Sequence, residues 1–295
     1  MKDNSFGRKC FTVFNYTLLI VTCVLCVLPF VHLLALSFSS STAVSAGEVT
    51  LWPVDFTTKA YEFAFQGGEF FRALWISVKR IIIGVPLSLL LIVLTAYPLS
   101  KTKDKVAGRN LYMAFFAVTM FVSGGMIPKY LVVSDLGLLD TIWALVLPGS
   151  LSVYNMIIML NFMRGLPNEI EEAAFIDGAS PIQALFRIQL PLLKPCLATL
   201  GLFSIIGHWN SWFDGVIYMN DTSLYPLQSY LHGLLRNFDE MMQLSGGDYI
   251  EMLSMMNART GRSAQLFLAA LPIMLVYPFL QKYFTKGLVL GSVKG

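Results

Sequence analysis

Long apolar stretches alternate with short charged segments along the chain. Asp, Glu, Lys and Arg are absent from six stretches, at residues 10–47, 81–100, 110–128, 141–163, 195–213 and 263–281. Each has about the 20 residues that an α-helix needs to cross roughly 30 Å of hydrocarbon. Lipid offers no partner to backbone N–H and C=O groups, so such stretches cross it as helices. The pattern predicts an all-α polytopic membrane protein with six transmembrane helices.

Composition supports this prediction. Hydrophobic residues make up 56% and charged residues 13% of the 295 residues, against roughly 45–50% and 25% in soluble domains. The 22 Phe, 12 Tyr and 5 Trp exclude a disordered chain. A net charge of +3 without a basic, aromatic-rich stripe argues against nucleic-acid binding.

The first apolar stretch allows two interpretations. Lys2, Arg8 and Lys9 resemble the basic start of a cleaved signal peptide, and residues 44–46 (Val-Ser-Ala) resemble a cleavage site. However, the apolar run at 11–36 is far longer than the 7–15 residues of a signal-peptide core. We therefore expect a retained signal-anchor helix.

The distribution of charge predicts the orientation. Segments 1–9, 101–109, 164–194 and 282–295 together carry 13 basic and 6 acidic residues. The alternate segments, 48–80, 129–140 and 214–262, carry 8 basic and 12 acidic residues. Because cytoplasmic loops are enriched in Lys and Arg, the first group is expected inside, with both termini in the cytoplasm.

The expected segments follow in chain order. They are a cytoplasmic N-terminal segment (1–15), the first transmembrane helix (16–36), an outer loop (37–72), the second helix (73–100), a cytoplasmic loop (101–109), the third helix (110–128), an outer loop (129–140), the fourth helix (141–163), a cytoplasmic segment (164–191), the fifth helix (192–218), an outer loop (219–262), the sixth helix (263–281) and a cytoplasmic tail (282–295).

No motif predicts an enzyme or a metal site. His32, His208 and His232 are scattered without metal-ligand spacing. The sequence contains no P-loop, G-x-S-x-G or H-E-x-x-H motif. Cys23 and Cys26 have redox spacing but lie in an apolar stretch, where small packing residues are the simpler interpretation. We expect neither catalytic nor metal-binding residues.

The cytoplasmic segment at 164–191 contains two short helix signatures. Asn168 suits an N-cap and Glu171 a capping box, and Gly178 suits the end of this first helix. Ser180 and Gln183 predict a capping box for a second helix. Helices this short need a surface to pack on. That surface could be the protein's own bundle, a lipid interface or a partner's groove; the acidic first helix favours a protein groove.

The same segment carries a recognisable pattern. Glu172-Ala173-Ala174, Gly178 four residues later, and Leu190-Pro191 resemble the EAA motif of ABC importer permeases. Asp177 before Gly178 is typical of carbohydrate importers. Residues 283–295 resemble the C-terminal tail of MalG-type sugar permeases. The chain is similar to permeases for oligosaccharides and polysaccharides, a group that includes alginate importers.

This resemblance implies a fold, partners and roles. It implies the type I ABC importer permease fold, with a core permease domain at about 73–285, in the bacterial inner membrane. It implies a second related permease, an ATPase dimer that binds ATP and Mg²⁺, an extracytoplasmic solute-binding protein and no cofactor bound by this chain. The residues implied to couple to the ATPase are Glu172, Ala173, Ala174, Asp177, Gly178, Leu190 and Pro191, with a further ATPase contact from Gly291, Ser292, Val293, Lys294 and Gly295.

Substrate contacts have open alternatives. Trp209, Asn210 and Trp212 could line a sugar path, or the tryptophans could form an interfacial belt. Asn155 lies within a span, where it could bind sugar or bond a neighbouring helix.

Lys79 and Arg80 are a separate case, at the outer end of the second span. They could attract an acidic saccharide or extend to lipid headgroups. An ion-coupled secondary transporter and a structural anchor are the alternative classes. The first would need ionisable residues within its spans or repeats with broken helices.

Overall fold

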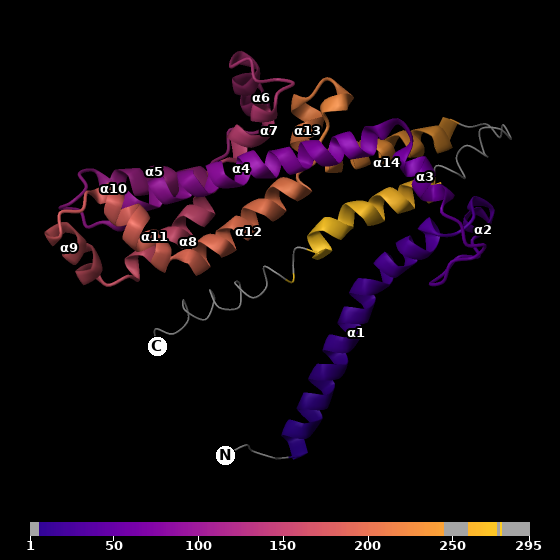
Figure 1. The fold of residues 1–295 in the computed structure, drawn as a ribbon, viewed down its shortest axis with the longest axis horizontal. Coiled ribbons are helices and arrows are strands. Elements are labelled where there is room, and N and C mark those ends of the chain that lie inside the picture. Colours follow the sequence, from indigo (N-terminus) through magenta and orange to yellow (C-terminus); the bar gives the residue numbers. More distant parts are fainter. Residues whose placement is uncertain (1–5, 245–258, 276–277, 279–295) are drawn as a thin grey trace. The chain divides into compact units, whose positions relative to one another are not determined.

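The structure is a computed structural model that describes residues 6–244, 259–275 and 278. Every regular element in these residues is helical (Figure 1). The elements are α1 (Phe6–Ser37), α2 (Ser41–Ala46), α3 (Lys59–Phe65), η1 (Gln66–Gly68), α4 (Glu69–Ser100), α5 (Arg109–Phe121), α6 (Met126–Asp135), α7 (Ile142–Val146), η2 (Leu147–Gly149), α8 (Val153–Arg164), α9 (Asn168–Ile176), α10 (Pro181–Gln183), η3 (Ala184–Gln189), α11 (Leu190–Leu192), α12 (Lys194–Asn210), α13 (Phe213–Tyr218), η4 (Thr222–Leu224) and α14 (Leu227–Leu244). Residues 259–275 are also helical, so the expected sixth span at 263–281 is described only in part.

The described chain divides into two compact units. Of the described residues, the first unit takes those up to Phe70 and those between Gly233 and Leu271, and the second takes Phe71–His232 and those from Pro272 onward. In the first unit, α1 is 32 residues long, about 48 Å at 1.5 Å per residue. Burial of α1 is confined to its C-terminal end, and most of its apolar side chains are exposed. Such a surface suits contact with lipid or another membrane helix.

The C-terminal end of α1 is held by the polypeptide that follows it. The Ser37 hydroxyl lies 2.9 Å from the Tyr61 hydroxyl, and the ring of Phe38 stacks on that of Phe56 with centroids 5.3 Å apart. Farther along the same unit, the Gln265 amide donates a hydrogen bond of 3.0 Å to the Ala64 carbonyl. These contacts join α1, α3 and helical residues 259–271 in one unit.

The second unit is built around α4, α8 and α12. Its main core combines Ile92, Val93, Ala96 and Leu99 of α4 with residues of α8 and α12, including Met156, Met159, Leu160 and Leu200. A smaller core joins α6, α7 and α13. Figure 1 shows α9, α10 and α11 gathered near the C-terminal end of α4. The second unit therefore presents two distinct regions along one long helix.

Only some of the described helices are long and apolar enough to cross a membrane on their own. Two of them, α1 and α4, are individually long and apolar enough to cross a membrane. Three further pairs qualify only as bent spans: α5 with α6 (115°), α7–η2 with α8 (52°), and α10–α11 with α12 (84°). By length and composition, the described residues thus contain between two and five candidate spans.

Local sequence explains two of these bends. Gly125 precedes α6 with φ 83° and ψ −173°, a conformation open essentially to glycine. Pro148 and Gly149 end η2, and the Ser152 hydroxyl then caps α8 by accepting from the Asn155 amide at 3.3 Å. The helix α6 continues to Asp135, so the expected boundary at 128/129 falls inside it.

Candidate functional site

A cavity of about 620 Å³ lies within the second unit. It is lined by residues of α4, α6–α8, α12 and α13, among them Asn155, Lys129 and Arg80. Serine side chains supply much of its polar wall: Ser88, Ser123, Ser150, Ser152, Ser204 and Ser211. Hydroxyl and amide groups of this kind can both donate and accept hydrogen bonds. The cavity is therefore suited to a polyhydroxylated ligand.

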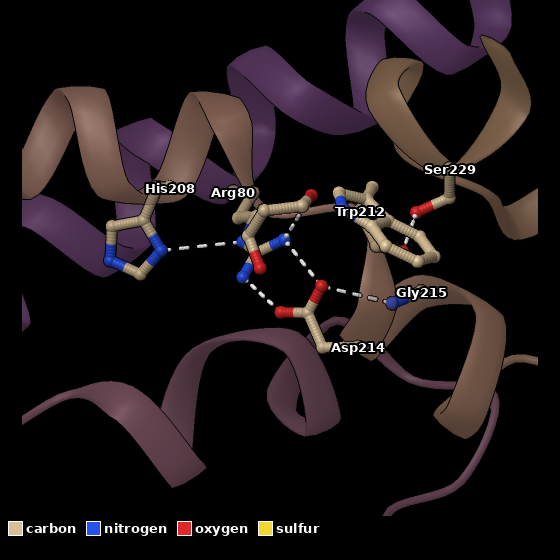
Figure 2. A network of polar contacts seen from close by, with 7 residues as sticks. Arg80, His208, Trp212, Asp214, Gly215 and Ser229 are labelled. Atoms are coloured by element: carbon tan, nitrogen blue, oxygen red, sulfur yellow. Dashed lines mark hydrogen bonds and ion pairs between the residues drawn. The ribbon is translucent and has the colours of Figure 1, made fainter. Parts of the chain in front are cut away.

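Arg80 of α4 forms the centre of a polar network at this cavity (Figure 2). Its guanidinium is only slightly exposed and pairs with the Asp214 carboxylate through both terminal nitrogens, one of them at 3.2 Å. Nε donates to Nδ1 of His208 at 3.3 Å, and Nη1 also lies 3.4 Å from the Ser211 carbonyl. A fork-shaped guanidinium matches a carboxylate in this two-point geometry.

The other members of the network fix the break between α12 and α13. The Asp214 carboxylate also accepts from the Gly215 amide at 2.9 Å, and the Ser229 hydroxyl donates to the Trp212 carbonyl at 2.7 Å (Figure 2). His208 packs so closely on α4 that a Cβ on Gly84 would lie 2.6 Å from its Nε2 atom. The network thus connects α4 to both sides of the break.

The segment around α9 forms a second candidate site, away from the cavity residues. Within α9, Glu172 and Ala173 are exposed, whereas Ala174 is buried. Ile176 is 86% exposed at the end of the helix, and Ile182 is 70% exposed after the turn. Gly178 adopts a left-handed φ of 82°, which permits the turn between α9 and α10. The predicted role of Gly178 in this turn is confirmed.

Capping at this segment follows the prediction in one helix and departs from it in the other. Ser180 and Gln183 form the predicted capping box, with hydrogen bonds of 3.3 and 2.9 Å. The predicted Asn168 cap is wrong: Pro167 occupies the N-cap position without a side-chain hydrogen bond. After α10 the chain forms a π-helical segment, η3, in which the buried Gln189 Oε1 has no protein partner among the described residues.

Glu171 has a different role from the predicted capping. Its carboxylate accepts from the Lys101 ammonium at 2.5 Å and from the Tyr97 hydroxyl at 2.9 Å. The same ammonium lies 4.0 Å from the centroid of the Tyr97 ring. A distant charged partner therefore takes the carboxylate that local helix rules assign to the cap.

Ionisation of this pair reflects partial burial. Burial acts to raise the pKa of Glu171, but hydrogen bonds from Lys101 and Tyr97 outweigh it and leave the pKa below its usual range. Burial lowers the pKa of Lys101, and attraction to Glu171 offsets only part of that effect. The Glu171 carboxylate accepts hydrogen bonds and the Lys101 ammonium donates one, which favours the charged form of each group. The geometry therefore supports a charged pair at neutral pH.

Comparison with known proteins identifies the family. Residues 1–289 match the family described as binding-protein-dependent transport system inner membrane component. The chain belongs to this family. Protein LplC of Bacillus subtilis is 40% identical over 293 residues, which cover 99% of this chain and 97% of that protein.

Two further similar proteins have names that describe polysaccharide transport. The polygalacturonan/rhamnogalacturonan transport system permease protein YtcP of Bacillus subtilis is 39% identical over 290 residues, covering 98% of this chain and 99% of that protein. A solved bacterial ABC transporter involved in the import of the acidic polysaccharide alginate matches with a TM-score of 0.86 and 31% identity, covering 96% of this chain and 100% of that one. The predicted resemblance is confirmed: the chain is a carbohydrate ABC importer permease.

In this permease, the predicted substrate-path residues do not form one cluster. Asn155 is buried and lines the cavity together with Arg80. Trp209 is buried, Asn210 is exposed, and Trp212 stacks on His232 with ring centroids 4.1 Å apart. Trp209, Asn210 and Trp212 do not belong to the cavity lining. Lys79, next to Arg80 in sequence, is exposed and also lies outside the lining.

Several site residues of the permease were not predicted. Asp214, His208 and Lys129 line the cavity, and Lys101 binds Glu171. Asp214 directly follows the apolar stretch 195–213, and this position was the signal available in the sequence. A buried Arg80 requires an acidic partner, and Asp214 could have been proposed as that partner. Among the described residues, no group of three or more His, Cys, Asp or Glu could hold a metal ion. The predicted tail contact at 291–295 lies outside the described residues.

Proposed function

We propose that this permease forms half of the translocation pathway of an ATP-driven, solute-binding-protein-dependent importer of oligosaccharides or polysaccharide fragments. A second, related permease completes the pathway, and an extracytoplasmic binding protein delivers the saccharide. ATP and Mg²⁺ are bound by a separate ATPase dimer, and this chain binds no cofactor. It crosses the bacterial inner membrane six times, with both termini in the cytoplasm, and residues 291–295 reach the ATPase dimer.

The surface of α9 is the observation that carries the proposal. Glu172 and Ala173 are exposed on it, and Phe175 and Ile176 extend an apolar area toward the turn. Exposed apolar area of this kind suits a protein groove. An acidic helix is disfavoured at an anionic leaflet, where basic polar faces bind. A groove in the ATPase, with a basic group for Glu172, fits this chemistry.

Substitutions in α9 test the coupling role. Glu172→Lys reverses the exposed charge, and Gly178→Val forces a β-branched residue into a left-handed conformation. In the reconstituted complex, both are expected to abolish uptake and substrate-stimulated ATP hydrolysis while leaving the membrane content of the chain unchanged. Lys103→Glu, an exposed charge reversal in another expected cytoplasmic loop, serves as the control. Normal uptake by Glu172→Lys would contradict the proposal.

The substrate is proposed to be an acidic saccharide. The alginate importer and the polygalacturonan/rhamnogalacturonan permease provide the comparison. In the cavity, Asp214 compensates the charge of Arg80, whereas no carboxylate of the described chain lies within ion-pair distance of Lys129. Lys129 is therefore the group that offers an uncompensated positive charge to a uronate.

Uptake of matched acidic and neutral oligosaccharides tests this specificity. Lys129→Ala is expected to reduce uptake of the acidic substrate at least fivefold and to leave neutral uptake within twofold. Lys79→Ala, which removes an exposed charge outside the cavity lining, is the matched control and should change neither. Equal losses on both substrates would contradict an acidic preference without affecting the coupling role of α9.

A further inference from the structure

Cationic side chains from three segments meet at the C-terminal end of α4. Arg109 Nε and Arg164 Nη2 both donate to the Leu99 carbonyl, at 2.9 and 3.1 Å. Lys101 follows the helix directly and pairs with Glu171 of α9. Positive charge is favoured here, because the last carbonyls of a helix have no partner within it and the helix dipole is negative at this end. The end of α4 is therefore tied to α5, α8 and α9.

Glu171 and Glu172 present adjacent acidic groups in different directions. Successive helical residues are turned by about 100°. Glu171 is 7% exposed and directed to Lys101, whereas Glu172 is exposed to solvent. The helix α9 thus combines an outward face that suits a partner with an inward carboxylate bonded to the end of α4.

Two routes lead from α9 to the cavity. One follows the chain, because α9 packs against η3, which continues through α11 into α12. The other crosses the Glu171 contacts to α4, a continuous helix that contributes Arg80, Ser88 and Ile92 to the cavity wall. Arg80 and Tyr97 are 17 positions apart on α4, about 26 Å along the helix axis. A packed helix of this length can carry a displacement between two sites.

We propose that Glu171, Lys101 and Tyr97 form a transmission link through which displacement of α9 moves α4 and reshapes the cavity. The proposal rests on the proposed coupling role of α9. Glu171 is a positioning residue that acts through Lys101 and Tyr97, and it does not contact the saccharide. The Lys101 ammonium can keep contact with both the carboxylate and the Tyr97 ring as α9 tilts, because its donors rotate on a flexible stem.

Charge exchange provides the test in the complete importer reconstituted in proteoliposomes. Lys101→Glu and Glu171→Lys each place like charges together, and each is expected to lower the saccharide transported per ATP hydrolysed at least tenfold. The double variant Lys101→Glu/Glu171→Lys restores an attractive pair and should return this ratio to within threefold of the unmodified importer. Lys103→Glu is the matched control, since Lys103 is exposed in the same loop.

Co-purification separates the link from docking. The single variants should retain the ATPase subunits, whereas Glu172→Lys should lose them. Unchanged transport per ATP in both single variants, or a double variant no better than either, would overturn the transmission link. If instead Glu172→Lys retains the ATPase and transports normally, the proposed coupling function itself fails. If a charge-reversed variant is absent from the membrane, Glu171→Gln replaces it, because the amide keeps an acceptor oxygen but removes the charge. Glu171→Gln should lower the saccharide transported per ATP at least threefold. An unchanged ratio would overturn the link.

Discussion

One ion pair lies on α4 at the cavity, and a second lies directly after the C-terminal end of α4, beside α9; the two pairs differ in chemistry. Arg80 meets Asp214 at the cavity, with side chains that are 4% and 20% exposed. Lys101 meets Glu171 beside α9, with side chains that are 14% and 9% exposed. The first pair uses a rigid planar fork and the second a compact ammonium on a flexible stem.

This difference bears on what each pair can do. Two parallel contacts from a guanidinium fix both the distance and the angle between α4 and the α12–α13 break. A single ammonium constrains distance and leaves orientation free. The cavity pair is therefore suited to hold a geometry, and the pair at α9 to maintain contact while geometry changes.

The largest expected effect comes from breaking the cavity pair. Asp214→Ala leaves the Arg80 charge buried without its carboxylate, which costs about 3–5 kcal/mol for such pairs. We expect a strong loss of folded permease, measured as the amount recovered in the assembled complex after mild detergent extraction. Lys79→Ala, at the exposed neighbouring position, should be recovered normally.

A double replacement sharpens this result. Arg80→Met/Asp214→Leu removes both charges and should recover most of the lost protein, because an apolar pair needs no charge compensation. If Asp214→Ala is recovered as well as the unmodified permease, the pair does not hold the geometry of the cavity.

A smaller effect is expected where α4 approaches His208. Gly84→Ala places a methyl group 2.6 Å from the imidazole Nε2, so the ring or α4 must shift, at about 1–3 kcal/mol. The matched control is Gly207→Ala, whose Cβ meets no atom within 4 Å. Thermal unfolding in detergent should show a lower midpoint for Gly84→Ala alone, and adding His208→Ala should reverse part of the change. Equal unfolding midpoints for Gly84→Ala and Gly207→Ala would show that α4 does not pack tightly against His208 at Gly84.

Acid titration examines the pair at α9. The pKa of Glu171 lies below its usual range, so the pair stabilises the segment above the ordinary carboxyl pKa and is lost as pH falls through the lowered value. Carbodiimide labelling, which needs a protonated carboxyl, should modify Glu171 only at a pH below the usual range for a glutamate. Lys101→Met removes the ammonium and leaves the burial, so labelling of Glu171 should shift to higher pH. Labelling of Glu171 at the same pH with and without the Lys101 ammonium would contradict the charged pair.

The smallest effect is expected at the Leu99 carbonyl. Arg109→Ala or Arg164→Ala should each cost about 0.5–1 kcal/mol, because the other guanidinium still donates to the same oxygen. The double variant should cost more than the sum of the two. Unfolding midpoints of the three variants measure this redundancy, and simple additivity would show that the two arginines act independently.

The sequence predicted apolar segments better than helix breaks. Charge-free stretches found the regions of α4, α8 and α12, because charge is excluded from a hydrocarbon environment. The breaks depend on local backbone chemistry that a charge map ignores. Gly125 before α6 and Pro148 in η2 were visible signals for two of them.

At the candidate sites, local features were predictable and distant pairs were not. The turn at Gly178 and the Ser180 capping box follow from residues within three positions. Glu171 was assigned to a cap because its partner, Lys101, lies 70 positions away. Lys79 and Arg80 look alike in sequence, yet their side chains leave α4 about 100° apart and only Arg80 lines the cavity.

The π-helical segment η3 sets the rotational phase between α9 and α12. A π turn accommodates an extra residue within a helix, and here it spans Ala184–Gln189. Deleting one residue from this segment would restore ordinary α-helical spacing and rotate α10, with the turn that joins it to α9, by about 100° relative to α11. The side chain of Glu172 would then point in a different direction, and a different face of α9 would occupy its present position. The direction in which α9 presents its exposed surface therefore depends on a single inserted position.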